Sequence, residues 1–167
     1  MPQLSLLTPC GELTISEENG AIVALDWGRG RDQQPTPLLQ RARSQLQDWF
    51  DGRRRSFDLP LAAAGTPFQQ RVWAGLRNIP FGQTRSYGEL ANLLGTAPRA
   101  IGQAMGANPL PILIPCHRVL AARGAIGGYS GHDGVTTKRL LLSHERRFCR
   151  ADPDLLSSPS ISPAGSF

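Results

Sequence analysis

The fold of this 167-residue chain is decided by the stretch Ser86-Tyr87-Gly88-Glu89-Leu90-Ala91-Asn92-Leu93-Leu94-Gly95 and by residues 96–107, which follow it. Ser86 is a favourable helix N-cap, and Gly95 is a favourable helix end. A short connection over 96–98 leads to a second predicted helix, residues 99–107. Two short helices joined by a tight, glycine-containing turn predict a helix-turn-helix, a motif that binds DNA.

The second of these helices is rich in small side chains, namely Ala100, Gly102, Ala104, Gly106 and Ala107. Each helical glycine costs about 1 kcal/mol relative to alanine. Two interpretations account for that cost. The helix packs closely against another helix in the core, or it approaches a nucleic-acid groove where bulky side chains would not fit.

Charge is unevenly distributed along the chain. Residues 65–148 carry 10 basic and 3 acidic side chains, whereas residues 1–64 carry 7 basic and 8 acidic ones. Residues 149–167 have a net charge of −1, and the whole chain has +5. A concentrated basic half is expected of a protein that binds a polyanion. If the basic half had no helix-turn-helix pattern, ordinary solubilising charge would be the better explanation of its positive charge.

The N-terminal part predicts a small sheet with one helix. Residues 12–16 alternate as a half-buried strand does, Asn19-Gly20 is a hairpin signal, and residues 21–27 form the next strand. Thr36-Pro37 begins a helix whose apolar positions recur up to residue 50, before Gly52 ends it. Residues 56–61 are expected to add one further strand.

These patterns divide the chain into parts. We expect an N-terminal domain over 1–61, a linker over 62–65, a DNA-binding and catalytic domain over 66–149, and a disordered Ser/Pro-rich tail over 150–167. The fold class is mixed α+β.

Cysteine and histidine usage limits the class of protein. The chain has three cysteines, an odd number, and they lie far apart in the sequence: Cys10, Cys116 and Cys149. This pattern does not suit a disulfide framework and favours a protein of the reducing cytosol. No Cys/His cluster has zinc-like spacing, so no metal is expected. No signal peptide or membrane span is expected either, and the predicted location is cytoplasmic.

A potential nucleophile lies beside a potential base at Cys116-His117-Arg118, directly after the apolar run 110–114. A thiol reacts as the thiolate, so it needs a base or a positive charge nearby. Glu145, in a helical stretch, could orient the histidine. On extended backbone, neighbouring side chains point in opposite directions, so the pair would need a bridging water. A buried structural cysteine beside a surface histidine remains the alternative.

Several separated motifs together resemble the O6-alkylguanine-DNA alkyltransferases. They are Pro115-Cys116-His117-Arg118-Val119, the preceding Asn108-Pro109, the later Gly-Tyr-Ser segment, and His144-Glu145. The resemblance is strong over 66–148 and weak over 1–61. It implies a ribonuclease-H-like N-terminal domain, a helix-turn-helix (winged-helix-like) C-terminal domain, no cofactor, and a monomer that repairs double-stranded DNA.

The resemblance also implies a mechanism. Cys116 takes the alkyl group from O6-alkylguanine once, with O4-alkylthymine left open as a second substrate. His117 acts as base through water, Glu145 orients it, Asn108 braces the active-site turn, and the Tyr87 hydroxyl donates to guanine N3. The base is rotated out of the duplex.

Further residues carry over from the same family. Arg99 matches an arginine that intercalates from the minor groove, although a plain phosphate contact is the simpler interpretation. The other predicted DNA-binding residues are Ala100, Gly102, Gln103 and Arg118. The predicted base pocket consists of Met105, Pro111, Val119, Tyr129, Ser130 and Gly131. The connection before Arg99 is shorter than the family usually has.

Three rival functions stay open at this point. A damage binder that transfers nothing would usually carry another residue in place of Cys116. A helix-turn-helix regulator with a sensor thiol would leave His117, Glu145 and Tyr87 unexplained. A cysteine hydrolase would need turnover and an oxyanion hole.

Overall fold

The computed structural model describes residues 1–129 and 133–150, and it divides the chain into two compact units at Ala64 and Gly65. Each unit has its own helices and strands. No helix in the described ranges combines the length and apolarity that crossing a bilayer requires.

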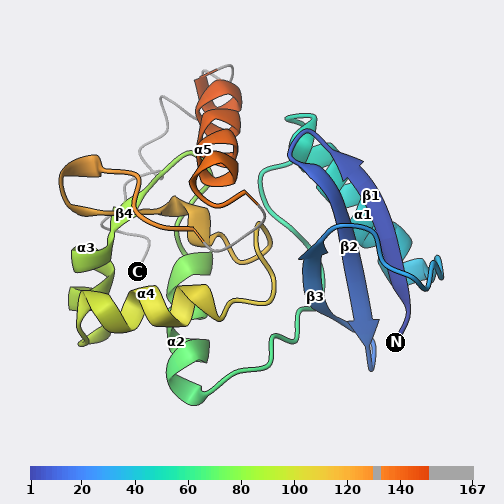
Figure 1. The fold of residues 1–167 in the computed structure, drawn as a ribbon, viewed down its shortest axis with the longest axis horizontal. Helices are drawn as coiled ribbons and strands as arrows, with labels where there is room; N and C mark the ends of the chain where they lie inside the picture. Colours follow the sequence, from blue (N-terminus) through green and yellow to red (C-terminus); the bar gives the residue numbers. More distant parts are fainter. Residues whose placement is uncertain (130–132, 151–167) are drawn as a thin grey trace. The chain divides into compact units, whose positions relative to one another are not determined.

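The first unit contains a three-stranded antiparallel sheet of β1 (Gln3–Thr8), β2 (Gly11–Glu18) and β3 (Ala21–Trp27), in that order (Figure 1). Asn19 and Gly20 connect β2 to β3 with φ of 52° and 78°. This is the left-handed pair that a two-residue hairpin requires, and Asn-Gly favours it.

One helix, α1 (Pro37–Phe50), contacts the sheet. The Thr36 hydroxyl accepts from the backbone N–H of Leu39 at 3.1 Å, and proline occupies the first turn, as the sequence predicts. The core of this unit is formed by Leu4, Leu6, Leu13, Ile15, Ile22, Leu25, Leu39, Leu46 and Trp49.

Two predictions for this unit were incomplete or wrong. β1 was not predicted, and the strand expected over 56–61 is absent. That segment forms only an isolated bridge, in which the Ile22 N–H donates to Pro60 at 2.8 Å and the Ala62 N–H donates to Ile22 at 2.9 Å. Pro60 has no N–H to give to a ladder, which limits the pairing.

The second unit begins with three mutually packed helices, α2 (Pro67–Arg77), α3 (Tyr87–Leu94) and α4 (Pro98–Gly106). The N-termini of α2 and α3 are both closed by capping boxes, and Gly95 ends α3 in the left-handed conformation. α4 starts one residue earlier than predicted, because Pro98 is suited to the first helical position. The Trp73 indole N–H donates to the carbonyl of Ala104 at 2.9 Å and joins α2 to α4.

The remaining elements bring distant segments together. β4 (Arg85–Ser86) pairs in parallel with β5 (Val119–Leu120). β4 leads directly into α3, and β5 directly follows the short 3₁₀ turn η1 (Cys116–Arg118). This pairing therefore brings the start of α3 beside η1. A second 3₁₀ turn, η2 (Ala122–Gly124), and α5 (Val135–Arg150) complete the unit. The predicted mixed α+β class, with a sheet unit before a helical unit, is confirmed.

Candidate active site

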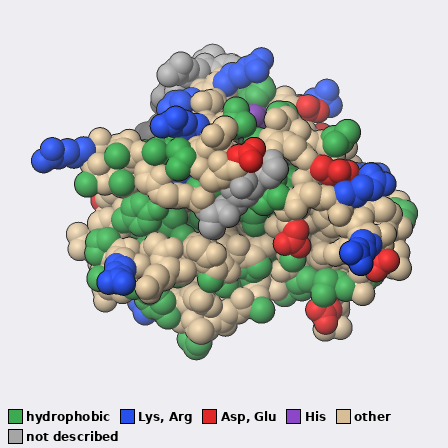
Figure 2. Space-filling view, in the orientation of Figure 1, with side chains coloured by type: hydrophobic (Ala, Val, Ile, Leu, Met, Phe, Trp, Pro, Cys, Tyr) green, Lys and Arg blue, Asp and Glu red, His purple; other side chains and the backbone are tan. Residues whose placement is uncertain are grey.

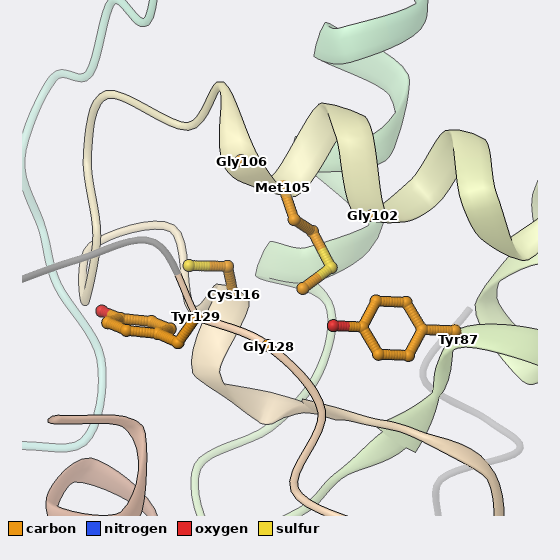
Figure 3. A pocket seen from close by; sticks show the side chains of 7 residues that line it. All are labelled: Tyr87, Gly102, Met105, Gly106, Cys116, Gly128 and Tyr129. Atoms are coloured by element: carbon orange, nitrogen blue, oxygen red, sulfur yellow. The ribbon is translucent and has the colours of Figure 1, made fainter. Parts of the chain in front are cut away.

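A pocket of about 440 Å³ lies against α3, α4, η1 and the segment leading to Tyr129 (Figure 3). Its lining residues are Tyr87, Gly102, Met105, Gly106, Cys116, Gly128 and Tyr129. It thus contains the predicted nucleophile and three residues of α4, two of which are glycines. The volume is within the range of about 300–1,000 Å³ that is common for small-molecule sites.

Cys116 is the first residue of η1 and is nearly buried. The turn is 3₁₀, so the extended backbone expected here was wrong. The cause is local, because the Arg118 N–H donates to the carbonyl of Pro115 at 3.1 Å and closes the turn. With three residues per turn, neighbouring side chains still diverge. Cys116 accordingly lines the pocket, whereas His117 is fully buried.

Asn108 braces the loop that carries Cys116. Its side-chain amide donates to the carbonyl of Ile114 at 2.9 Å, and its carbonyl oxygen accepts from the Leu110 N–H at 2.9 Å. Ile112, inside this loop, has φ of 73°, which is unusual for a β-branched residue and costs about 1–3 kcal/mol. The Asn108 bonds, on both sides of Ile112, help to hold that strained turn.

Burial raises the pKa of the Cys116 thiol above its ordinary value. A hydrogen bond from Asn108 and the positive charge of Lys138 lower that pKa in part. An unassisted thiol here would therefore stay protonated at neutral pH, and the reaction needs a base.

Glu145 is the centre of a buried cluster of hydrogen bonds. Its Oε2 lies 2.6 Å from Nε2 of His117, and the guanidinium of Arg118 donates to both of its oxygens at 2.9–3.0 Å. The backbone N–H of Gly82 also donates to Oε1 at 3.0 Å. Burial raises the pKa of Glu145, but His117 and Arg118 outweigh it and lower the pKa to about 2.

These contacts define the proton positions on His117. Burial lowers the pKa of His117, although Glu145 opposes the shift, so the imidazole is neutral at pH 7. An ionised carboxylate only accepts hydrogen bonds, so Nε2 of His117 carries the proton and donates to Glu145. Nδ1 then bears the lone pair and is the basic atom of the ring.

Lys138 is a residue of the site that sequence reasoning missed. Its side chain is buried on α5, and Nζ donates to the carbonyls of Val119 at 2.6 Å and Gly128 at 3.2 Å. Nζ also lies 5.9 Å from the centre of the Tyr87 ring. Burial lowers the pKa of Lys138 to about 8, and the nearby Cys116 opposes that shift. The available signal was its spacing, because Lys138 precedes Glu145 by seven residues and shares its helix face.

Tyr87 is the first residue of α3 and projects into the pocket, with its hydroxyl toward Cys116 and Gly128 in Figure 3. Burial raises the pKa of Tyr87. Its hydroxyl therefore keeps its proton and is available as a donor.

α4 presents two different faces. Ile101, Ala104 and Met105 are buried, whereas Arg99 and Gln103, four residues apart, are exposed. Among the other predicted DNA-binding residues of this helix, Ala100 and Gly102 are partly exposed. Ala104 thus packs in the core, as the first interpretation expects, whereas Gly102 lies beside the pocket.

Arg118 requires a correction. It was predicted to contact DNA, but its side chain is nearly buried, bonds to Glu145, and donates to the carbonyl of Ile79 at 2.6 Å. Its guanidinium also lies 5.8 Å from the ring centre of Phe81. These contacts assign Arg118 to holding the Glu145 carboxylate.

The predicted pocket residues are only partly brought together. Met105 and Tyr129 line the pocket. Pro111 and Val119 are buried and do not appear in its described wall, and the Val119 carbonyl accepts from Lys138. Ser130 and Gly131 lie outside the described residues.

Across residues 1–129 and 133–150, no three His, Cys, Asp or Glu side chains lie together in a way that could hold a metal ion.

Figure 2 shows acidic side chains mainly over the sheet unit, and mostly Lys and Arg projecting from the helical unit. This agrees with the charge asymmetry of the sequence.

Comparisons with known proteins give a consistent result. The family described as "6-O-methylguanine DNA methyltransferase, ribonuclease-like domain" matches residues 5–63, and "6-O-methylguanine DNA methyltransferase, DNA binding domain" matches residues 67–147. The constitutive methylated-DNA–protein-cysteine methyltransferase of Bacillus subtilis is 44% identical over 152 residues, covering 83% of this chain and 92% of the relative. The methyltransferase of that name from Salmonella typhimurium is 39% identical over 160 residues, covering 84% and 92%. A crystal structure of Mycobacterium tuberculosis OGT in complex with DNA superposes with a TM-score of 0.80 at 38% identity, covering 89% of this chain and 94% of the other.

Proposed function

Because the chain belongs to the 6-O-methylguanine DNA methyltransferase family, we propose that it repairs duplex DNA by moving the alkyl group of O6-alkylguanine onto Cys116. The observation that carries this assignment is a thiol at the wall of a pocket, one residue before a buried His117–Glu145 pair separated by 2.6 Å. O4-alkylthymine, which offers a comparable carbon to the sulfur, enters the proposal as a second substrate.

The first step is activation of the thiol. The basic Nδ1 of His117 takes the Cys116 proton through a bridging water, because the two side chains diverge on the 3₁₀ turn. The imidazolium that forms is stabilised by the Glu145 carboxylate at Nε2. Arg118 keeps Glu145 ionised and fixed throughout, and Lys138 stabilises the thiolate with its charge.

The second step is transfer. The thiolate attacks the alkyl carbon, so an S–C bond forms while the C–O6 bond breaks and its electron pair passes to the guanine. The Tyr87 hydroxyl donates to N3 and stabilises the negative charge that develops on the ring. The proton held by His117 returns through water, so the products are guanine and a thioether. A thioether is a poor leaving group, and each molecule therefore reacts once.

Access to the base requires that the nucleotide leave the stack, at a cost of a few kcal/mol. We propose that α4 enters the minor groove, where its small face permits close approach and where sequence readout is weak. The exposed Arg99 at the start of α4 fills the space left by the base. The protein acts as a monomer in this scheme.

The test is stoichiometry. Duplex DNA with one O6-methylguanine is added in increasing excess, and restored guanine is counted against protein. We expect one guanine per protein and no further reaction. Continued turnover would contradict the proposal, and lesion binding without restoration would favour the damage-binder alternative.

A further inference from the structure

The turn that follows α2 contacts the buried cluster around Glu145 through two backbone groups. The carbonyl of Ile79 accepts from Nη1 of Arg118 at 2.6 Å, and the N–H of Gly82 donates to Oε1 of Glu145 at 3.0 Å. The Arg118 guanidinium and the Glu145 carboxylate bond to each other at 2.9–3.0 Å. One short segment thus provides an acceptor to the cation and a donor to the anion of the same buried ion pair.

The turn is itself held by backbone hydrogen bonds at both ends. The Ile79 N–H donates to the carbonyl of Leu76 at 3.1 Å, and the Gln83 N–H donates to the carbonyl of Pro80 at 3.1 Å. Between them, Gly82 has a φ of 81°, the sign that the third position of a type II turn requires and that favours glycine. The direction of the Gly82 N–H is therefore fixed by the peptide plane of a closed turn, not by a movable side chain.

α5 lies too close to Gly82 for a side chain to fit there. A Cβ at this position would lie 2.8 Å from Sγ and 3.0 Å from Cβ of Cys149, and 4.0 Å from the backbone oxygen of Glu145. Cys149 follows Glu145 by about one turn of α5. Glycine at position 82 therefore lets the turn lie directly against the helix that carries the carboxylate.

The position of this carboxylate matters because its second oxygen bonds to His117. Oε2 of Glu145 lies 2.6 Å from Nε2 of His117, while Oε1 is the oxygen that Gly82 holds. The two oxygens share one rigid carboxylate plane, so fixing Oε1 also fixes the direction in which Oε2 faces the imidazole. Hydrogen bonds weaken steeply when they are misaligned. A carboxylate turned away from Nε2 would stabilise the imidazolium less.

We propose that Gly82 is a positioning residue for the activation of Cys116. Its N–H and the Ile79 carbonyl clamp the Arg118–Glu145 pair, so that the carboxylate stays directed at His117. Gly82 touches no reacting atom and acts only through Glu145. The inference deepens the proposed function and rests on it, because it takes His117 as the base of that reaction.

The experiment measures iodoacetamide labelling of Cys116, identified by its peptide, between about pH 6 and pH 10, which spans the ordinary pKa of a thiol. Gly82→Ala should label about 10-fold more slowly at pH 7, the effect of losing one hydrogen bond to a charged group. The rate should approach that of wild type in alkali, where the thiol ionises without a base. The matched control is Gly95→Ala, because Gly95 also has a positive φ, 67°, but a Cβ there meets nothing within 4 Å. It should follow the wild-type profile.

A double variant separates the clash from the backbone strain. Gly82→Ala/Cys149→Gly removes the contact with Cys149, so its profile should lie between those of Gly82→Ala and Cys149→Gly. Urea unfolding gives the folded fraction of each protein. If Gly82→Ala alone does not fold, the comparison of the double variant with Cys149→Gly decides, and a slowing confined to neutral pH supports the inference.

Three results would overturn the inference. They are profiles of the Gly82 variants that coincide with their reference proteins, a slowing of equal size at every pH, and an equal slowing in Gly95→Ala. Transfer of methyl from O6-methylguanine in duplex DNA is measured with wild type in parallel. Its absence would contradict the proposed function, whereas the labelling profiles would still decide whether Gly82 positions the base of Cys116.

Discussion

Lys138 carries a positive charge that lowers the pKa of the Cys116 nucleophile. It is buried, bonds to two carbonyls, and lowers the pKa of Cys116 electrostatically. We predict that Lys138→Met slows the labelling of Cys116 below pH 8, where the Lys138 ammonium is charged, because loss of a nearby opposite charge disfavours the thiolate. The measurement is the pH dependence of iodoacetamide labelling at Cys116. The neighbouring and exposed Arg139→Met is the matched control.

The same residue predicts a loss of rate in mild alkali. Its pKa is about 8, so the ammonium is charged below that pH and neutral above it. The electrostatic support of the thiolate should therefore decline as pH rises through 8. The transfer rate of wild type should bend downward there relative to Lys138→Met, which has no such group. Parallel pH profiles for the two proteins would contradict this role.

A second residue-scale prediction separates binding from chemistry at Cys116. The small Cys116 side chain lines the pocket. Among the described residues, it does not join distant segments by several hydrogen bonds as the Glu145 carboxylate does. The affinity of Cys116→Ala for duplex DNA should stay within about 3-fold of the wild-type affinity, a smaller change than the loss of a specific DNA contact would cause. Alkyl transfer by this variant should be lost completely. Gel-shift titration alongside the transfer assay checks both. Loss of binding would indicate a structural role for the thiol.

At the scale of elements, α4 is expected to act on DNA through its exposed face. Arg99→Ala should slow transfer from duplex DNA more than transfer from the free base O6-benzylguanine, because only the duplex has a gap to fill. Arg77→Ala, another exposed arginine of the same unit, is the control. Equal loss on both substrates would argue against a role in opening the duplex.

The helices and strands also show which elements sequence patterns can predict. α3 was predicted from Ser86 to Gly95 because its cap and its stop are both local signals. β1 was missed because its pairing depends on a partner strand. η1 was predicted as extended because a 3₁₀ turn of three residues leaves no period in the sequence. Local signals thus defined the helices, whereas short elements held by tertiary contacts could not be seen.

At the scale of the whole molecule, Glu145 links the site to acid stability. Its pKa is about 2, below the ordinary value of 4.5, so its stabilising contribution is complete above pH 4.5 and is lost as pH falls toward 2. The shift corresponds to about 3 kcal/mol. The difference in unfolding free energy between wild type and Glu145→Gln should shrink over that range, as measured by urea unfolding. Glu18→Gln, an exposed carboxylate change, is the control, and a pH-independent difference for Glu145→Gln would contradict the account.

The candidate site was predicted in part for a comparable reason. Cys116 and His117 are adjacent, and Glu145 belongs to a motif, so the sequence alone indicated them. The place of Lys138 in the site and the pairing of Arg118 with Glu145 depend on how α5 packs against η1. No local sequence pattern specifies that packing. The family membership that the sequence indicated is confirmed by the matches over residues 5–63 and 67–147.

The most direct test of the central claim is to locate the transferred group. The protein is incubated with duplex DNA containing one O6-methylguanine, and its peptides are analysed by mass spectrometry. The account predicts one added methyl on the Cys116 peptide and none on the peptides of Cys10 and Cys149. An unmodified Cys116 in folded protein that still binds the lesion, or a methyl on another residue, would contradict it.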